Sequence, residues 1–129
     1  MIISFSKDQF VERIASGQKI HTVRSDQHNR WKPGMKMHMW RGNPRNTSAN
    51  PYHFANAVVK TVARINISLT DLDGVFNYIT IDGKLLNDVQ MEAFAKSDGF
   101  DDLKQMAEFF PEPFWGKLII WEQLEIIKK

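Results

Sequence analysis

The spacing of apolar and polar residues predicts a strand followed by a helix at the start of the chain. Residues 2–5 are short, apolar and β-prone, which is typical of a strand. Residues 6–16 have helical spacing, with Ser6 and Gln9 matching a capping box and Gly17 as the expected stop. We expect this helix to pack through one apolar face, which comprises Phe10, Val11, Ile14 and Ala15.

Residues 17–24 place several polar side chains between this helix and a second expected strand. Because strand side chains alternate between faces, Lys19 and His21 should point one way and Thr22 the other. Arg24 should share the side of Thr22. Lys19 and Thr22 can therefore meet in one site only if the segment is irregular or if Lys19 precedes the strand.

The following segment predicts a turn, a strand and a long loop. The Pro-Gly pair at 33–34 is a strong turn signal, and residues 35–41 then alternate with Met35, Met37 and Met39 on one face. Residues 42–53 are rich in Asn, Pro and Ser and have no periodicity. We expect them to form a long mobile loop, which in a compact domain is often functional.

Two further strands are expected in the middle of the chain. Residues 54–69 alternate over a long stretch that Val58 and Val62 interrupt, which predicts a bent or bulged strand. Residues 76–81 resemble another strand. The dipeptide at 82–83 is Asp-Gly, which favours a tight turn after it.

The last third predicts two capped helices. Asn87 is the expected cap of a helix over 88–96, and Asp101 is the expected cap of a helix over 102–110. The corner between the helices falls at 97–100. Their inward faces are expected to comprise Met91, Phe94, Ala95, Leu103, Met106, Ala107 and Phe110.

The order of elements predicts the fold class. Residues 117–127 carry apolar side chains on both faces, which is typical of a final strand buried on both sides. The whole order is strand, helix, several strands, two helices and a last strand. We expect one α+β domain over 1–129, built as a small curled sheet or barrel with helices at its ends.

Charge is distributed unevenly although the net charge is only +2. Residues 19–45 carry seven Lys and Arg against one acid, whereas residues 71–112 are acid-rich. Arg24 and Arg41 suit phosphate because a guanidinium matches two phosphate oxygens, and Arg45 lies near the start of the expected loop. A basic face of this kind favours phosphate-bearing ligands, and a solvated basic loop explains the charge equally well.

Composition excludes several kinds of chemistry. The chain has no cysteine, so it has no disulfide, thiolate metal site or cysteine nucleophile. Its four histidines match no zinc spacing, and it contains neither a Gly-rich phosphate loop nor a G-x-S-x-G elbow. No segment approaches the roughly 18 apolar residues of a membrane span. We expect no metal, no cofactor and no membrane partner, and a cytoplasmic location.

The tryptophans fall into two groups. Trp31 and Trp40 lie within the basic stretch, where an indole can stack on a nucleic-acid base, although core packing is the commoner outcome. We keep both as candidate RNA-binding residues. Trp115 and Trp121 lie near or within the final strand, and we assign them to the core.

Four motifs together resemble the ASCH domains of the PUA-like β-barrel superfamily. Residues 17–24 match the family's G-x-K-x-x-T-x-R signature, and W-K-P-G at 31–34 precedes a strand. A-K-S-D-G-F at 95–100 lies between two helices, and F-W-G-K-L-I-I-W at 114–121 lies near the end. The motifs keep the family's order over almost the whole chain. The resemblance implies a PUA-like small β-barrel.

The resemblance also implies a link to RNA, since the roles proposed for this family include RNA binding, RNA cleavage and removal of acetyl groups from modified cytidine. In its N4-acetylcytidine amidohydrolase branch the functional residues are a Lys, a Thr three positions later and a downstream acid. Lys19 and Thr22 match the first two positions. At the acid position this chain has Asp98, which is one methylene shorter than the Glu of that branch.

These residues support three hypotheses about function. The leading one is an ASCH domain that binds RNA or a modified nucleoside in a basic cleft formed by Lys19, Thr22, Arg24, Arg41 and Asp98. The alternative is a hydrolase of an acylated nucleoside, or of RNA itself, with Thr22 as nucleophile, Lys19 as base and Asp98 as acid/base or orienting group. Lys19 and Asp98 can instead form a simple salt bridge that pins the corner, with Thr22 as an ordinary strand residue. The third hypothesis is a non-catalytic adaptor whose basic face binds an acidic protein.

Overall fold

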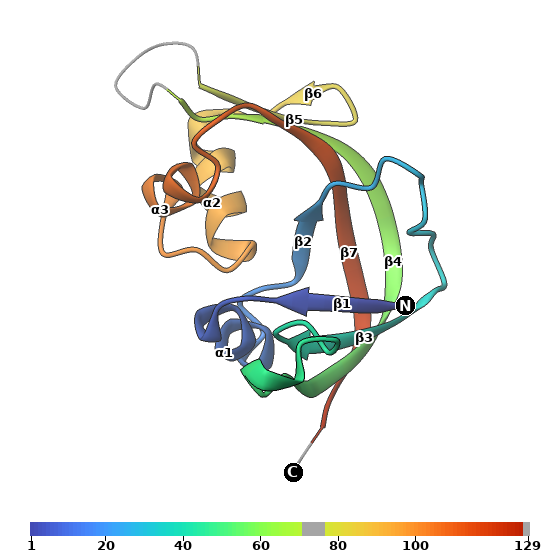
Figure 1. Ribbon diagram of the computed structural model, residues 1–129. Helices are drawn as coiled ribbons and strands as arrows, with labels where there is room; N and C mark the ends of the chain where they lie inside the picture. Colours follow the sequence, from blue (N-terminus) through green and yellow to red (C-terminus); the bar gives the residue numbers. More distant parts are fainter. Residues whose placement is uncertain (71–76, 128–129) are drawn as a thin grey trace.

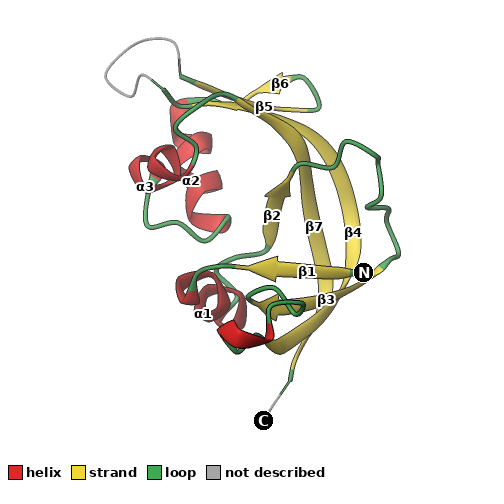
Figure 2. Cartoon of the chain, viewed as in Figure 1, coloured by secondary structure: helices red, strands yellow, loops and turns green. Residues whose placement is uncertain are grey.

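The computed structural model describes residues 1–70 and 77–127, and within them the chain forms a mixed α+β structure with a strongly curved sheet (Figure 1). The elements in chain order are β1 (Ile2–Phe5), α1 (Asp8–Ser16), β2 (His21–Arg24), β3 (Lys36–Arg41), the 3-10 helix η1 (Thr47–Ala49), β4 (Tyr52–Ser68), β5 (Tyr78–Ile81), β6 (Lys84–Leu85), α2 (Asp88–Ser97), α3 (Leu103–Phe109) and β7 (Phe114–Ile126). The α-helices lie on the concave side of the sheet (Figure 2).

The long strands β4 and β7 form the centre of the sheet. They pair antiparallel, and β3 and then β1 extend the sheet from one side of β4, with β1 parallel to β3. β2 pairs antiparallel with the other side of β7. Near its end β4 also pairs with β5, which forms a hairpin with β6. The α+β class is confirmed.

The sheet is curled, which is one of the two expected forms, and it does not close into the barrel that the family resemblance implies. A barrel needs every strand edge paired, yet the described part of β1 pairs only with β3, and β2 pairs only with β7. A side chain spans the gap instead: Arg24 Nη2 donates to the main-chain oxygen of Ser4 at 2.7 Å. The free edges of β1 and β2 therefore flank an opening in the sheet.

The bent strand predicted over 54–69 is confirmed as β4. Its register with β7 shifts between Asn56 and Val58 and again between Val59 and Thr61. Bulges bend a strand and increase its twist. One continuous strand can therefore pair with β3, β7 and β5 and curve the whole sheet.

α1 begins without a side-chain cap, so the capping box predicted from Ser6 and Gln9 is wrong. The Gln9 amide and the Arg13 guanidinium instead donate to the main-chain oxygen of Gly99, at 2.9 and 2.8 Å. Gly17 ends the helix in the left-handed conformation, with a φ of 85°, as predicted. These contacts tie α1 to the corner between α2 and α3.

The caps of the other helices follow the sequence closely. Asn87 and Gln90 form a full capping box at the start of α2. Asp102, rather than the predicted Asp101, caps α3 by accepting from the main-chain N–H of Gln105. The Asp-Gly turn after β5 is confirmed, and Phe76 of the strand predicted over 76–81 lies outside the described residues.

The final strand corrects the assignment of the tryptophans. Leu118 and Ile119 are both buried, which confirms that the centre of β7 is covered on both faces. Trp121 is 7% exposed and lies in the core, but Trp115 is 73% exposed, so its assignment to the core is wrong. Near its start β7 is covered on the face of Phe114 only, and alternation places Trp115 on the other face.

No helix in the described residues is long and apolar enough to cross a bilayer.

Candidate functional site

A cavity of about 420 Å³ opens where the sheet fails to close. It is bordered by β1, α1, β2, the corner after α2, and the start of β7. Its lining includes Lys19, Thr22, Arg24 and Asp98, besides three serines and Asn43. Six phenylalanines also line it: Phe5, Phe10, Phe100, Phe109, Phe110 and Phe114.

The polar residues meet because Lys19 precedes the strand. β2 begins only at His21, and the main-chain N–H of Lys19 donates to Arg13 at the end of α1. The next N–H, that of Ile20, donates to the main-chain oxygen of Ser97 at 3.0 Å. This junction departs from strand alternation, so Lys19 and Thr22 line the same cavity.

The Lys19 side chain is almost fully buried and bonded to Asp98. It is 2% exposed, and Nζ donates to the main-chain oxygen of Asp98 at 2.6 Å and to Asp98 Oδ1 at 3.3 Å. Nζ also lies 5.0 Å from the ring centroid of Phe10 and 5.7 Å from that of Phe5. Burial lowers the pKa of Lys19 below its ordinary 10.5, Asp98 offsets part of the effect, and the charge of Arg24 adds to it.

Gly99 makes room for the lysine stem. Its φ is 98°, a region that favours glycine, and a Cβ at this position would lie only 2.8 Å from Lys19 Cδ and 3.1 Å from the ring of Phe10. A glycine directly after Asp98 therefore permits the acid, the lysine and α1 to pack together.

His21 packs against this site, although it was not among the predicted site residues. Its Nδ1–H donates to Asp98 Oδ1 at 2.8 Å, and Nε2 is hydrogen-bonded to Ser97 Oγ at 2.9 Å. The ring stacks on Phe94 with centroids 4.7 Å apart. The signal that could have found it was the strand alternation that grouped His21 with Lys19.

Asp98 is therefore held from two sides through one oxygen. Its Oδ1 is the atom bonded to both Lys19 and His21. The described residues provide no hydrogen-bond partner for Oδ2, and none of their fully buried side-chain N or O atoms lacks a partner. The Asp98 side chain is 4% exposed and lines the cavity, so Oδ2 is the oxygen left for a ligand there. This oxygen is available to accept a hydrogen bond from a ligand.

The same reasoning applies to Thr22. The residue is 4% exposed and lines the cavity, and no described residue forms a hydrogen bond with its hydroxyl. Because every fully buried polar side-chain atom in the described chain has a partner, the Thr22 hydroxyl must be accessible from the cavity. It can donate or accept one bond with a ligand.

Arg24 provides the second cation of the site. Its Cζ lies 4.9 Å from the ring centroid of Phe5, and its guanidinium bridges to Ser4 across the opening in the sheet. Burial lowers the pKa of Arg24 to about 10, an effect that Asp98 partly offsets. Arg24 is therefore still charged at neutral pH, so the two cations exceed the single acid in this cavity whenever Lys19 is protonated.

The other two predicted arginines do not line the cavity. Arg41 Nε donates to Asp8 Oδ1 at 2.8 Å, an exposed ion pair between β3 and α1. Arg45 is exposed in the segment before η1. Gly42 and Asn43, at the start of the predicted loop, do line the cavity. The predicted cleft therefore keeps four of its five residues and excludes Arg41.

The two tryptophans predicted to stack on a base have other neighbours. Trp31 is buried in the core, and its main-chain N–H donates to Asp26 Oδ2 at 3.1 Å. Trp40 stacks on His53, with centroids 5.4 Å apart and rings nearly parallel. The aromatic surface of the cavity thus comes from phenylalanines.

In the part of the chain that the structure describes, no group of three or more His, Asp or Glu side chains is placed to hold a metal ion. Comparisons with protein-family models, with curated proteins and with solved structures found no match to this chain. The geometry of the cavity is therefore the basis for proposing a function.

Proposed function

We propose that the cavity binds a nucleoside, or a single base of an RNA, in a PUA-like domain of the ASCH type. The observation that carries this proposal is the combination of six phenylalanines with polar groups deep in one cavity. Aromatic rings stack on any base, and a few placed polar groups then select and orient it. The volume of about 420 Å³ lies within the range of small-molecule sites.

The free polar atoms define what the ligand should offer. Asp98 Oδ2 can accept from an amino or imino N–H of a base, and the Thr22 hydroxyl can bond to a neighbouring group. Arg24 adds a charged donor for a carbonyl, ribose or phosphate oxygen. Cytosine offers an amino N–H and uracil an imino N–H, so both pyrimidines can supply the donor that Asp98 needs.

Binding of nucleosides tests this function directly. We expect calorimetry at low salt to detect binding of at least one of cytidine, N4-acetylcytidine and uridine. Thr22→Val should weaken binding by about tenfold, because it removes one hydrogen bond at nearly constant volume. Ser48→Ala, outside the cavity, is the control. Absence of binding by every nucleoside and by short RNAs would refute the proposal.

A second candidate function, hydrolysis of an N4-acylated cytidine, is favoured by one observation. A buried lysine with a lowered pKa lines the same cavity as an accessible threonine hydroxyl. Neutral Lys19 would take the hydroxyl proton while Thr22 Oγ bonds to the acyl carbon, and the C–N bond would then break as the amine receives that proton. Water would hydrolyse the Thr22 ester to release the acid.

In this reaction Asp98 would orient Lys19. It is shorter than the Glu of the amidohydrolase branch, but its Oδ1 and its main-chain oxygen both reach Lys19 Nζ. Release of cytidine from N4-acetylcytidine, followed by chromatography, tests the reaction. We expect Thr22→Ser to retain activity and Thr22→Val and Lys19→Met to lose at least about a hundredfold. Equal rates in wild type and Thr22→Val would exclude the mechanism.

A further inference from the structure

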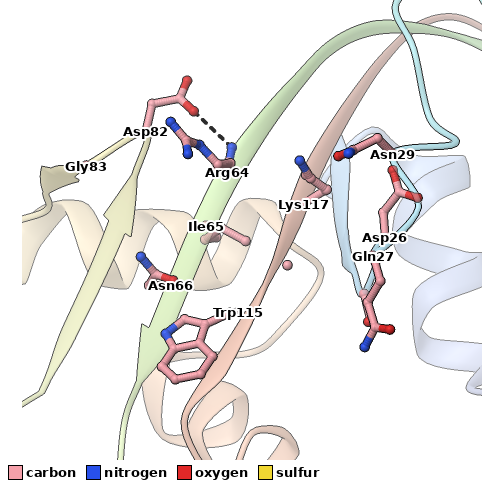
Figure 3. A pocket seen from close by; sticks show the side chains of 12 residues that line it. Asp26, Gln27, Asn29, Arg64, Ile65, Asn66, Asp82, Gly83, Trp115 and Lys117 are labelled. Atoms are coloured by element: carbon pink, nitrogen blue, oxygen red, sulfur yellow. Dashed lines mark hydrogen bonds between the residues drawn. The ribbon is translucent and has the colours of Figure 1, made fainter.

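A second hollow, of about 710 Å³, lies on the sheet beside the cavity (Figure 3). Its main lining side chains come from β4, β7 and the segment after β2. They include Arg64, Asn66, Trp115, Lys117 and Gln27. None of these residues belongs to the cavity described above, but Ser25 lines both spaces. The second hollow and the cavity therefore adjoin.

Strand register aligns three cations across this region. Arg64 on β4 stands directly opposite Lys117 on β7, and Lys117 stands opposite Arg24 on β2. We call these three residues the cation row. Directly opposed residues share a face of a sheet and lie about 5 Å apart, and like charges in that position are destabilising. The cation row leads from the second hollow to the cavity that Arg24 lines.

The two outer cations, Arg64 and Lys117, form no ion pair with a described residue, although Asp26 and Asp82 line the same hollow. Neither the Arg64 guanidinium nor the Lys117 ammonium has an ion pair or hydrogen bond there. The acids nearby serve the main chain: Asp82 Oδ1 accepts from the N–H of Arg64 at 2.9 Å, and Asp26 accepts from two loop N–H groups. An anionic ligand would neutralise the cation row.

Trp115 adds an aromatic surface beside these charges. It is 73% exposed and stands opposite Asn66, and Figure 3 shows the indole beside the Asn66 side chain. Exposed aromatic rings next to cations are the usual components of a surface for single-stranded nucleic acid, in which bases stack and phosphates meet Lys and Arg.

We propose that the second hollow binds the single-stranded nucleic-acid segment next to the base held in the cavity, with phosphates along the cation row and one base stacked on Trp115. This inference rests on the proposed function for its starting point, the base in the cavity. It makes the ligand a nucleotide within a strand, since a free nucleoside would leave the second hollow empty.

The test compares three ligands on the same variants. Wild type, Trp115→Ala and Lys117→Gln are titrated with a mixed-sequence nine-nucleotide RNA, with its DNA counterpart and with cytidine. Trp115→Ala should weaken RNA binding about 5- to 150-fold and leave cytidine binding unchanged. Lys117→Gln should lower the slope of log K against log salt by about 0.7. Tyr78→Ala and Lys60→Gln, which remove an exposed ring and charge outside both spaces, are the matched controls.

The outcomes separate this inference from the proposed function. Loss of RNA binding by Trp115→Ala, with cytidine binding kept, supports both. RNA binding that needs Trp115 but is unchanged by Thr22→Val, with no binding of nucleosides, supports the strand-binding surface and refutes the base-binding cavity. RNA affinity that is equal in Trp115→Ala and Tyr78→Ala overturns the inference and favours an acidic protein as occupant. If Trp115→Ala weakens binding of RNA and of DNA equally, the second hollow recognises bases and phosphates. If it weakens binding of RNA alone, the second hollow also recognises the ribose.

Discussion

The cavity and the second hollow use the same kinds of residue in opposite ways. In the cavity, Lys19 and Asp98 are almost fully buried and bonded to each other. In the second hollow, Lys117 and Arg64 have no charged partner within the described chain, and Trp115 is exposed. Charge inside the cavity is therefore part of what holds the protein together, whereas charge in the second hollow is available to a ligand. Substitutions in the two places should differ accordingly.

The largest difference is expected between the two tryptophans of β7. Trp121→Ala should lower the free energy of unfolding by about 3–5 kcal/mol, because it empties a core position. Trp115→Ala should change it by less than about 0.5 kcal/mol, because its ring is exposed. Urea denaturation measures both. Similar losses in the two variants would mean that Trp115 is covered in solution.

Two neighbouring acids offer the next comparison. Asp98→Asn leaves buried Lys19 without a counter-charge and should cost about 3 kcal/mol. Asp101→Asn removes the partner of Arg13 in an exposed ion pair and should cost less than about 1 kcal/mol. Thermal unfolding at one pH compares them. If Asp98→Asn is as stable as Asp101→Asn, the Lys19–Asp98 pair does not support the fold.

Glycines in the same backbone conformation give a smaller effect. Gly99→Ala combines a positive φ with a Cβ that would meet Lys19 and Phe10, so we expect a loss of about 2–3 kcal/mol. Gly83→Ala has a φ of 81° but nothing within 4 Å, so only about 1 kcal/mol of backbone strain remains. Urea denaturation measures both losses in the free energy of unfolding, and their difference gives the contribution of close packing around Lys19. Equal losses would show that the corner between α2 and α3 adjusts to an added Cβ.

The dependence of stability on pH should be the smallest effect. The pKa of Lys19 is lowered in the folded state, so the unfolded chain binds more protons between that lowered pKa and 10.5. The cost of burying the charged lysine is full below this window and disappears as pH rises through it. Wild type should therefore gain stability relative to Lys19→Met with rising alkaline pH, by at most about 1.4 kcal/mol per pH unit. Urea titrations at several pH values measure this difference in the free energy of unfolding. If the difference between wild type and Lys19→Met stays constant or falls as pH rises, burial does not lower the pKa of Lys19.

Most elements of the fold could be predicted because their signals are local. The Asn87 cap, the Gly17 stop and the Asp-Gly turn at 82–83 depend on a few neighbouring residues, and all three are confirmed. The interrupted alternation of 54–69 likewise predicted a bulged strand. The start of α1 was harder, because Gln9 bonds to a main-chain oxygen 90 residues away instead of capping its own helix.

The sequence by itself determined the α+β class, the order of elements and the presence of Lys19, Thr22 and Arg24 at a helix-to-strand junction. Tertiary structure decided that the sheet stays open, that His21 joins Asp98, that Arg41 pairs with Asp8 and that Trp115 faces outward. The reason is physical. Periodicity and capping are properties of adjacent residues, whereas burial and pairing depend on which distant segment covers a given face.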